Sequence, residues 1–151
     1  MEQALTDEQR RLHLRDHVKD ANKKLSGAAH SAGVKRFAIF HDAGYKGLYG
    51  GMGQMDIKRI KGIPEQEDLL DCIDREELAA NEFRITQTEA KLKREGIQGE
   101  EKATQAHFSV GRRVRSAIEE IKGIMPEKLP RVPSIKKLAD KQNKDSKQLK
   151  Q

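Results

Sequence analysis

The stretch that decides the fold is residues 36–63, RFAIFHDAGYKGLYGGMGQMDIKRIKGI. It holds four of the six aromatic residues of the chain and six of its twelve glycines. Bulky rings dominate what a core or an interface can bury, and this chain has few of them. Glycine permits positive φ angles and close approach of two backbones. We therefore expect a central aromatic-glycine cluster against which the longer helices pack. Its members are Phe37, Phe40, Tyr45, Gly47, Tyr49 and Gly50.

The glycine spacing in this stretch matches no nucleotide-binding loop. A P-loop is excluded because no Gly-Lys-Ser/Thr follows and no apolar strand precedes. The segment Gly44-Tyr45-Lys46-Gly47 has the GxxG pattern with which a KH domain holds a nucleic-acid backbone, and this makes Lys46 a candidate phosphate contact. A helix-hairpin-helix is disfavoured because Pro64 lacks the amide that would bind a DNA phosphate. The simpler interpretation is that the glycines turn the chain between short helices.

Apolar residues recur at helical spacing along most of the chain, and no segment alternates convincingly as a strand does. Thr6 with Gln9, and Asp74 with Glu77, form capping signatures at the starts of two long helices. Gly96 marks the end of the second of these. The sequence therefore predicts an all-α fold, a compact multi-helix domain. The predicted helices cover residues 7–32, 37–49, 54–61, 65–73, 75–95, 100–122 and 135–142.

Positive charge is concentrated at the C-terminal end. The formal net charge is +6, and from Lys128 onward eight Lys and Arg residues stand against two Asp and Glu, so the first 127 residues balance. Pro126, Pro130 and Pro133 interrupt regular structure there. We predict a helical domain over residues 1–125, then a basic tail over 126–151 with one short helix and a disordered end. Such a tail suits an anionic partner such as nucleic acid, or serves only to keep the chain in solution.

Several classes of protein find no support in the sequence. No run is long enough to span a membrane and no apolar leader follows Met1, so we expect a cytoplasmic protein. Cys72 has no partner for a disulfide or a metal, and His13 and His17 lack a third ligand, so neither a metal nor a cofactor is predicted. No nucleophile, base and orienting group stand together as an active site requires. We therefore predict a protein that is not an enzyme, and a nuclease or other hydrolase is unsupported.

The densest group of cations outside the tail lies in the last long helix. Guanidinium groups make strong, bidentate pairs with phosphate oxygens. If the two long C-terminal helices form a hairpin, these arginines align with the tail lysines in one stripe. The alternative is an ordinary charged helix surface. The candidate contacts for nucleic acid or a protein partner are Arg112, Arg113, Arg115, Lys136, Lys137, Lys141 and Lys46.

The first predicted helix offers an alternative function. Leu14, Val18 and Leu25 form an apolar stripe along it, and so few large side chains make a thin core. The stripe could pair with a second copy of the chain in a homo-dimer. The protein would then be a helical interaction or self-association module without direct contact to nucleic acid.

Three stretches resemble one family: FAIFHDAGYKGLYGGMG (37–53), ELAANEFRITQTEAKLKREGIQGEEKATQAHFSVGRRVR (77–115) and IMPEKLPRVPSIKKL (124–138). They are similar to the C-terminal half of the bacterial DNA-damage-inducible protein D family, over about residues 6–138. The resemblance implies a cytoplasmic accessory protein of the DNA-damage (SOS) response that acts on recombinase filaments on single-stranded DNA, in repair or recombination. It carries no established catalytic site. Family members usually have an N-terminal BRO-type domain ahead of this half, so we expect either a trimmed form or a short relative.

Overall fold

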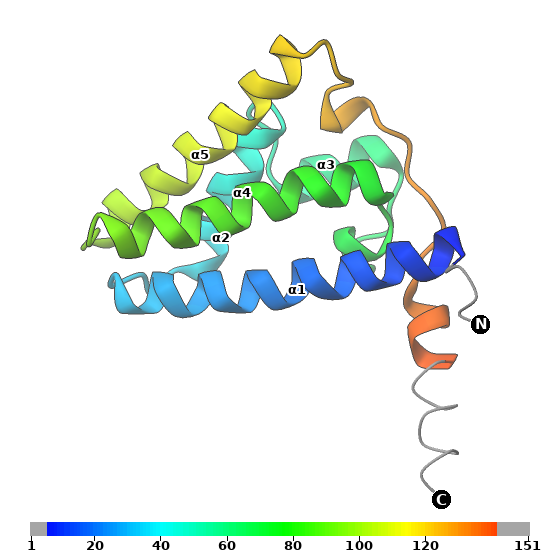
Figure 1. The fold of residues 1–151 in the computed structure, drawn as a ribbon, viewed down its shortest axis with the longest axis horizontal. Coiled ribbons are helices and arrows are strands. Elements are labelled where there is room, and N and C mark those ends of the chain that lie inside the picture. The colour runs from blue at the N-terminus through cyan, green and yellow to red at the C-terminus, as the bar shows by residue number, and fades with distance from the viewer. Residues whose placement is uncertain (1–5, 142–151) are drawn as a thin grey trace, which may run out of the picture.

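The computed structural model describes residues 6–141, and all regular structure within them is helical (Figure 1). The all-α prediction is confirmed. No helix in this part of the chain combines the length and apolar character needed to cross a membrane. The elements are α1 (Asp7–Ser31), α2 (Phe37–Leu48), α3 (Gln54–Lys61), the 3-10 turn η1 (Leu69–Asp71), α4 (Arg75–Arg94), α5 (Glu100–Glu120) and the 3-10 turn η2 (Pro126–Lys128). Residues 136–141 are helical as well.

Local signals set most of the helix ends. Thr6 and Gln9 form the capping box of α1, since the Thr6 side chain accepts from the Gln9 amide and the Gln9 side chain accepts from the Thr6 amide. The Asp74 carboxylate caps α4. Gly62 ends α3 with a φ of 70°, a left-handed conformation that favours glycine. The predicted bounds of these helices lie within one or two residues of the observed ones.

The helix predicted over residues 65–73 was wrong, because only the short turn η1 forms there. Leu69, Leu70, Cys72 and Ile73 are all buried, which leaves no solvent-facing side for a helix. The local backbone bonds here are those of a 3-10 turn, from the residue-71 amide to the residue-68 carbonyl and from the residue-72 amide to the residue-69 carbonyl. The carbonyls of residues 71 and 72 accept from the amides of residues 135 and 132, which fixes the end of the turn to the segment after α5.

The long helices are arranged in two parallel pairs (Figure 1). In the first pair, α1 runs beside α4, and Arg75 at the start of α4 lies 3.9 Å from Asp7 at the start of α1. In the second pair, α2 runs beside α5, with Arg36 against Glu100 at one end and Gly50 against Arg115 at the other. The turn between α1 and α2 meets the turn between α4 and α5, where the amide of residue 99 donates to the carbonyl of residue 32.

The aromatic-glycine cluster belongs to α2 and the two residues that follow it. Phe40 and Tyr49 are fully buried and Tyr45 nearly so, whereas Phe37 is half-buried at the edge of the core. Gly47 packs directly on the α5 backbone, where an added Cβ would collide with the carbonyl of residue 108. Gly50 is exposed just after α2 and has a φ of 66°.

The apolar stripe of α1 faces the interior of its own chain. Val18 and Leu25 have no exposed surface, and Leu14 packs partly buried against the same core. Parallel packing of α4 on α1 covers this side of the helix. The stripe is therefore not free to pair with a second copy of the chain.

The segment after α5 lies along the body instead of leaving it at Pro126. The carbonyls of Pro126 and Leu129 accept from Lys61, the residue-132 and residue-135 amides bond to the η1 region, and Ile135 is 1% exposed. Packing and hydrogen bonds thus continue across the boundary expected between residues 125 and 126. The disordered end that we predict, beyond residue 141, lies outside the described residues.

Candidate functional site

The candidate cations do not form one stripe. Arg112 and Arg113 are exposed on α5, whereas Arg115 is turned inward. Lys136 and Lys137 belong to the short helix at the lower right of Figure 1, far from α5 at the upper left. The basic residues are therefore distributed over separate surfaces, and the proportion of basic to acidic side chains differs from one surface to the next.

Arg115 is occupied by contacts within the chain. Its guanidinium donates to both carboxylate oxygens of Glu127, at 2.7 and 2.8 Å, and to the carbonyl of Leu48 at 3.1 Å. The hydrogen bonds to Glu127 raise the pKa of Arg115 despite partial burial. Burial alone would raise the pKa of Glu127, but the bonds from Arg115 outweigh it and lower that pKa. This arginine fastens η2 to the ends of α2 and α5.

Arg112 and Lys46 are brought together on the other side of α5. The guanidinium carbon of Arg112 lies 5.9 Å from the centre of the Phe108 ring, and Lys46 and Phe108 line one shallow pocket of about 350 Å³. The carboxylate of Asp42, one helical turn before Lys46, is engaged elsewhere, because it accepts from the Gln54 amide at 2.7 Å. Among the described residues, no ion pair involves Arg112 or Lys46.

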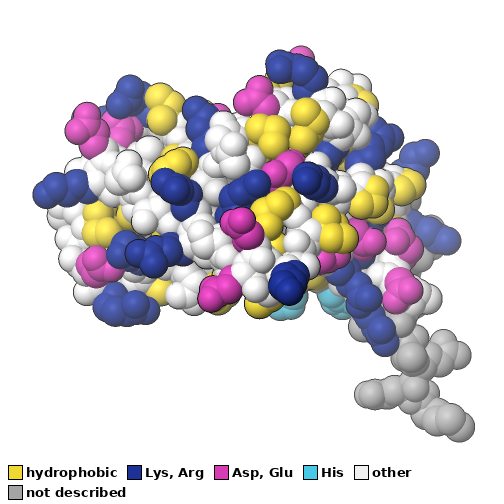
Figure 2. Space-filling view, turned by 90° about the horizontal axis from the view of Figure 1, so that it is seen from above, with side chains coloured by type: hydrophobic (Ala, Val, Ile, Leu, Met, Phe, Trp, Pro, Cys, Tyr) yellow, Lys and Arg dark blue, Asp and Glu magenta, His cyan; other side chains and the backbone are white. Residues whose placement is uncertain are grey.

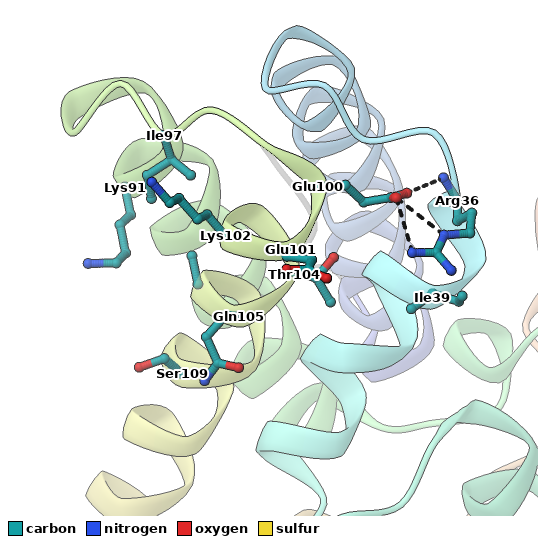
Figure 3. A pocket seen from close by; sticks show the side chains of 11 residues that line it. Arg36, Ile39, Lys91, Ile97, Glu100, Glu101, Lys102, Thr104, Gln105 and Ser109 are labelled. Carbon is teal, nitrogen blue, oxygen red and sulfur yellow. Dashed lines mark hydrogen bonds and ion pairs between the residues drawn. The ribbon is translucent and has the colours of Figure 1, made fainter.

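This pocket continues into a larger one of about 870 Å³, shown in Figure 3, and the two share Ile39, Thr104 and Gln105. At its edge, Arg36 is fixed by Glu100, which accepts from the Arg36 amide at 2.6 Å and from its side chain at 3.2 Å. These bonds, the backbone one foremost, lower the pKa of Glu100. We call this surface the α2–α5 face. It comprises Arg36, Ile39, Lys46, Lys102, Thr104, Gln105, Phe108 and Arg112, together with the acidic side chains Asp42, Glu100 and Glu101. Lys91 and Ser109 line the larger pocket on the side that faces α4.

Arg113 points away from this face, into a groove between α4 and α5 of about 420 Å³. Figure 2, which looks down on this side of the molecule, shows dark blue side chains separated by yellow and magenta ones. The surface is thus mixed, and positive charge dominates only locally. We call this second surface the α4–α5 groove. It is lined by Phe83, Gln87, Lys91, Arg94, Glu95, Ser109, Val110, Arg113, Val114 and Ala117.

The remaining candidate cations lie among carboxylates. Lys136 and Lys137 line a pocket of about 690 Å³ beside Arg15 and Lys19, and four acidic side chains share it. One of them, Asp71, accepts from Arg15 at 2.7 Å and lies 3.2 Å from Lys19. Burial raises the pKa of Asp71, but its hydrogen bond with Arg15 and the charge of Lys19 more than offset this, so the pKa is lowered. Lys141 is exposed and is the last described residue.

Sequence reasoning missed a polar network in the interior. Lys61 donates to Glu77 Oε1 at 2.9 Å, Tyr49 donates to Glu77 Oε2 at 2.5 Å, and Asn81 donates to the Tyr49 hydroxyl at 3.0 Å. Arg84 continues the chain by donating to Asn81 Oδ1 at 2.8 Å. The signal was present, because residues 77, 81, 84 and 88 recur at helical spacing beside the apolar positions of α4, yet polar side chains at such positions are easily taken for a solvent face.

The network ends at His107, which is fully buried. Its Nε2 lies 2.7 Å from Arg84 Nη1 and its Nδ1 lies 2.8 Å from the Phe40 carbonyl. Because a guanidinium can only donate, Nε2 must accept and Nδ1 must carry the proton. Burial, and then the charge of Arg84, lower the pKa of His107 well below its ordinary value, so the ring is neutral. The lack of a side chain at Gly44 leaves room for the contact between Arg84 and His107, because an added Cβ would collide with both of these side chains.

A serine and a histidine also meet, on α1 and α2. Ser26 Oγ lies 2.8 Å from His41 Nε2, and burial lowers the pKa of His41. Among the described residues no carboxylate hydrogen-bonds the His41 ring, which packs against the rings of Phe40 and His107. The pair therefore lacks the orienting acid of a catalytic triad. Among residues 6–141, no three His, Cys, Asp or Glu side chains gather as metal ligands would.

The structure is thus a compact all-helical domain in which Arg112 and Arg113, exposed on α5, make no ion pair among the described residues. The chain belongs to the DinD C-terminal domain family, whose model matches residues 5–138. It is 49% identical over 129 residues to the DNA damage-inducible protein D of Escherichia coli (strain K12), which is 83% of this chain and 47% of that protein. The chain thus spans about half the length of the curated relative it matches. No solved structure shows a significant match.

Proposed function

We propose that this chain acts in the DNA-damage response as a non-enzymatic binding domain that contacts single-stranded DNA, bare or coated by a recombinase, and so regulates repair or recombination. The name of its Escherichia coli relative supports the cellular role. The α2–α5 face supports the mode of binding. The observation that carries the proposal is that Arg112 and Lys46 both lie beside Phe108 and make no ion pair among the described residues, while Asp42, the carboxylate of the same pocket, accepts from the Gln54 amide.

The chemistry of this face suits a flexible, anionic strand. Cations that track a phosphate backbone, together with a ring on which a base can stack, are the elements of sequence-tolerant binding to single strands. Phe108 and Ile39 supply apolar surface, and Thr104 and Gln105 supply hydrogen-bonding groups beside them. Because Arg36 is paired with Glu100, its charge is partly neutralised, and it adds less to phosphate binding than an unpaired cation would. Binding through so few phosphate contacts will be moderate in affinity and sensitive to salt.

The test is fluorescence anisotropy with a labelled oligo-dT strand at about 50 and about 200 mM salt. The double variant Lys46→Gln/Arg112→Gln should bind more weakly at low salt and should lower the slope of log K against log salt by about one for each cation removed. The control Lys24→Gln/Lys93→Gln removes the same charge from two exposed lysines already paired with Asp20 and Glu89. It should keep most of the affinity.

Absence of binding at low salt, or equal loss in the control, would remove DNA as a direct ligand of this face. Repeating the titration with a recombinase-coated strand then separates the two forms of the proposal. Binding only to the coated strand assigns the contact to the filament. Retention of that binding in Lys46→Gln/Arg112→Gln would place the filament contact elsewhere on the domain.

A further inference from the structure

The α4–α5 groove combines an apolar floor with a basic rim. Val114 is almost fully buried in it, and Val110 and Ala117 lie along the same side of α5. Phe83 stands on α4 across the groove and is 54% exposed, although it is one of only four phenylalanines in the chain. An exposed ring beside a partly buried aliphatic floor offers surface that a partner would remove from water.

The rim of the groove carries cations that the chain does not neutralise locally. Arg94 and Arg113 have no carboxylate three or four residues away in either direction, and among the described residues no ion pair involves them. Lys91 is the exception, because it donates to Glu95 at 2.6 Å. The exposed lysine outside the groove, Lys93, is likewise paired, with Glu89. One arginine from α4 and one from α5 thus stand at the groove without an ion pair in the described part of the chain.

We propose that the α4–α5 groove binds an acidic peptide segment of a partner protein. One or two apolar side chains of that segment would cover Phe83 and the Val110–Val114 floor, and its carboxylates would pair with Arg94 and Arg113. Arginine forks favour carboxylates in bidentate geometry, and apolar anchors ringed by charge are the usual basis of peptide recognition in helical grooves. The inference does not rest on contact with DNA at the α2–α5 face.

The groove fits a peptide better than a nucleic-acid strand. The floor of the groove is aliphatic, formed by Val110, Val114 and Ala117, which suits an apolar side-chain anchor, whereas the α2–α5 face has the polar side chains of Thr104 and Gln105 beside its ring. Glu95 also lies on the rim, but it is paired with Lys91 at 2.6 Å and leaves Arg94 and Arg113 available to an acidic segment. At about 420 Å³, the space suits one or two side chains rather than a run of stacked bases.

The experiment is selection of random peptides on the whole chain, followed by counter-selection on Phe83→Ala. Peptides retained by the wild type and lost on the variant should be acidic and should carry a Phe, Leu, Ile or Trp anchor. Titration of the best labelled peptide should show about tenfold weaker binding to Phe83→Ala and to Arg94→Gln/Arg113→Gln. Thermal melting of each variant checks that it is folded, which is expected because all three side chains are exposed.

Lys46→Gln/Arg112→Gln serves as the matched control, because it removes two cations from the opposite flank of α5. It should leave peptide affinity unchanged, just as Arg94→Gln/Arg113→Gln should leave oligo-dT affinity mostly unchanged. Recovery of no Phe83-dependent peptide, or of peptides without an acidic bias, would overturn the proposal. So would loss of oligo-dT binding in Phe83→Ala, which would make the groove a nucleic-acid site.

Discussion

Arg84 and Arg112 lie on neighbouring helices, yet one is 1% exposed and the other projects into solvent. Arg84 is stacked over Tyr45, with its guanidinium carbon 4.7 Å from the ring centre, and bonds to His107 and Asn81. Arg112 touches only Phe108 among the aromatic residues. The interior cation fixes how the helices meet, whereas the outer one is left free for a ligand. A count of basic residues therefore overstates the charge available for binding.

The largest loss of stability is expected from a substitution of Lys61, which lies at the other end of the interior polar network. Lys61 donates to Glu77, to the Pro126 carbonyl and to the Leu129 carbonyl. Lys61→Met leaves the buried Glu77 carboxylate without its cation and two carbonyls without this donor, and should lower the free energy of unfolding by about 3–5 kcal/mol. Urea denaturation measures this. The control Lys93→Met breaks an exposed pair and should cost less than about 1 kcal/mol. Equal effects would show that Lys61 is not a structural cation.

The contact between α2 and α5 should be nearly as sensitive to a single methyl group. A Cβ on Gly111 would lie 2.7 Å from the carbonyl oxygen of Gly44 and 2.9 Å from the amide of Leu48, both backbone atoms that cannot move aside. Gly111→Ala should therefore destabilise the chain by about 1–3 kcal/mol. Gly27→Ala is the matched control, because nothing lies within 4 Å of its added Cβ.

Gly27 lies inside α1, where alanine is the better helix former, so Gly27→Ala should stabilise by roughly 0.5–1 kcal/mol. Opposite signs for the same substitution in two helices would establish that close approach, rather than helix propensity, governs residue 111. A stabilising Gly111→Ala would contradict the helix contact described here. Chemical denaturation of both variants under one set of conditions decides the matter.

The pH dependence of stability should report on the buried end of the network. The pKa of His107 lies well below its ordinary value of 6.5 because of burial and the charge of Arg84. The unfolded chain takes up this proton near pH 6.5 and the folded chain does not. His107 therefore contributes stability above pH 6.5 that is lost as the pH falls below it, at up to about 1.4 kcal/mol per pH unit. His41 acts in the same direction.

The comparison of wild type with His107→Gln at each pH isolates this contribution, because burial raises the pKa of Glu77 and so gives that group the opposite sign. The variant should show a shallower loss of stability between about pH 6.5 and 5. His13→Gln, at an exposed position, provides the control and should follow the wild type. An unchanged slope in His107→Gln would mean that the pKa of His107 is the same in the folded and the unfolded chain.

The sequence could predict most helix ends because their causes are local, such as the Thr6–Gln9 box and the glycine after Lys61. It could not predict how the segment 65–73 is held, since the carbonyls of residues 71 and 72 bond to amides more than fifty positions away. The same limit applies to the cations. Helical spacing identifies Arg112 and Arg113 as exposed, but only the return of the chain after α5 reveals that Arg115 meets Glu127.

The smallest effects on stability are expected from substitutions of Arg115 and Arg112, two arginines that are close neighbours in sequence. Arg115→Gln removes the paired hydrogen bonds to Glu127 and the bond to the Leu48 carbonyl, and should cost about 1 kcal/mol, since both side chains are partly exposed. Arg112→Gln should change stability by less than about 0.5 kcal/mol. The DNA titration should give the reverse order, with Arg112→Gln the weaker binder. A variant of Arg115 that loses DNA binding while keeping full stability would move this residue from the structural group to the ligand-binding one, and the division between inner and outer cations would have to be drawn elsewhere.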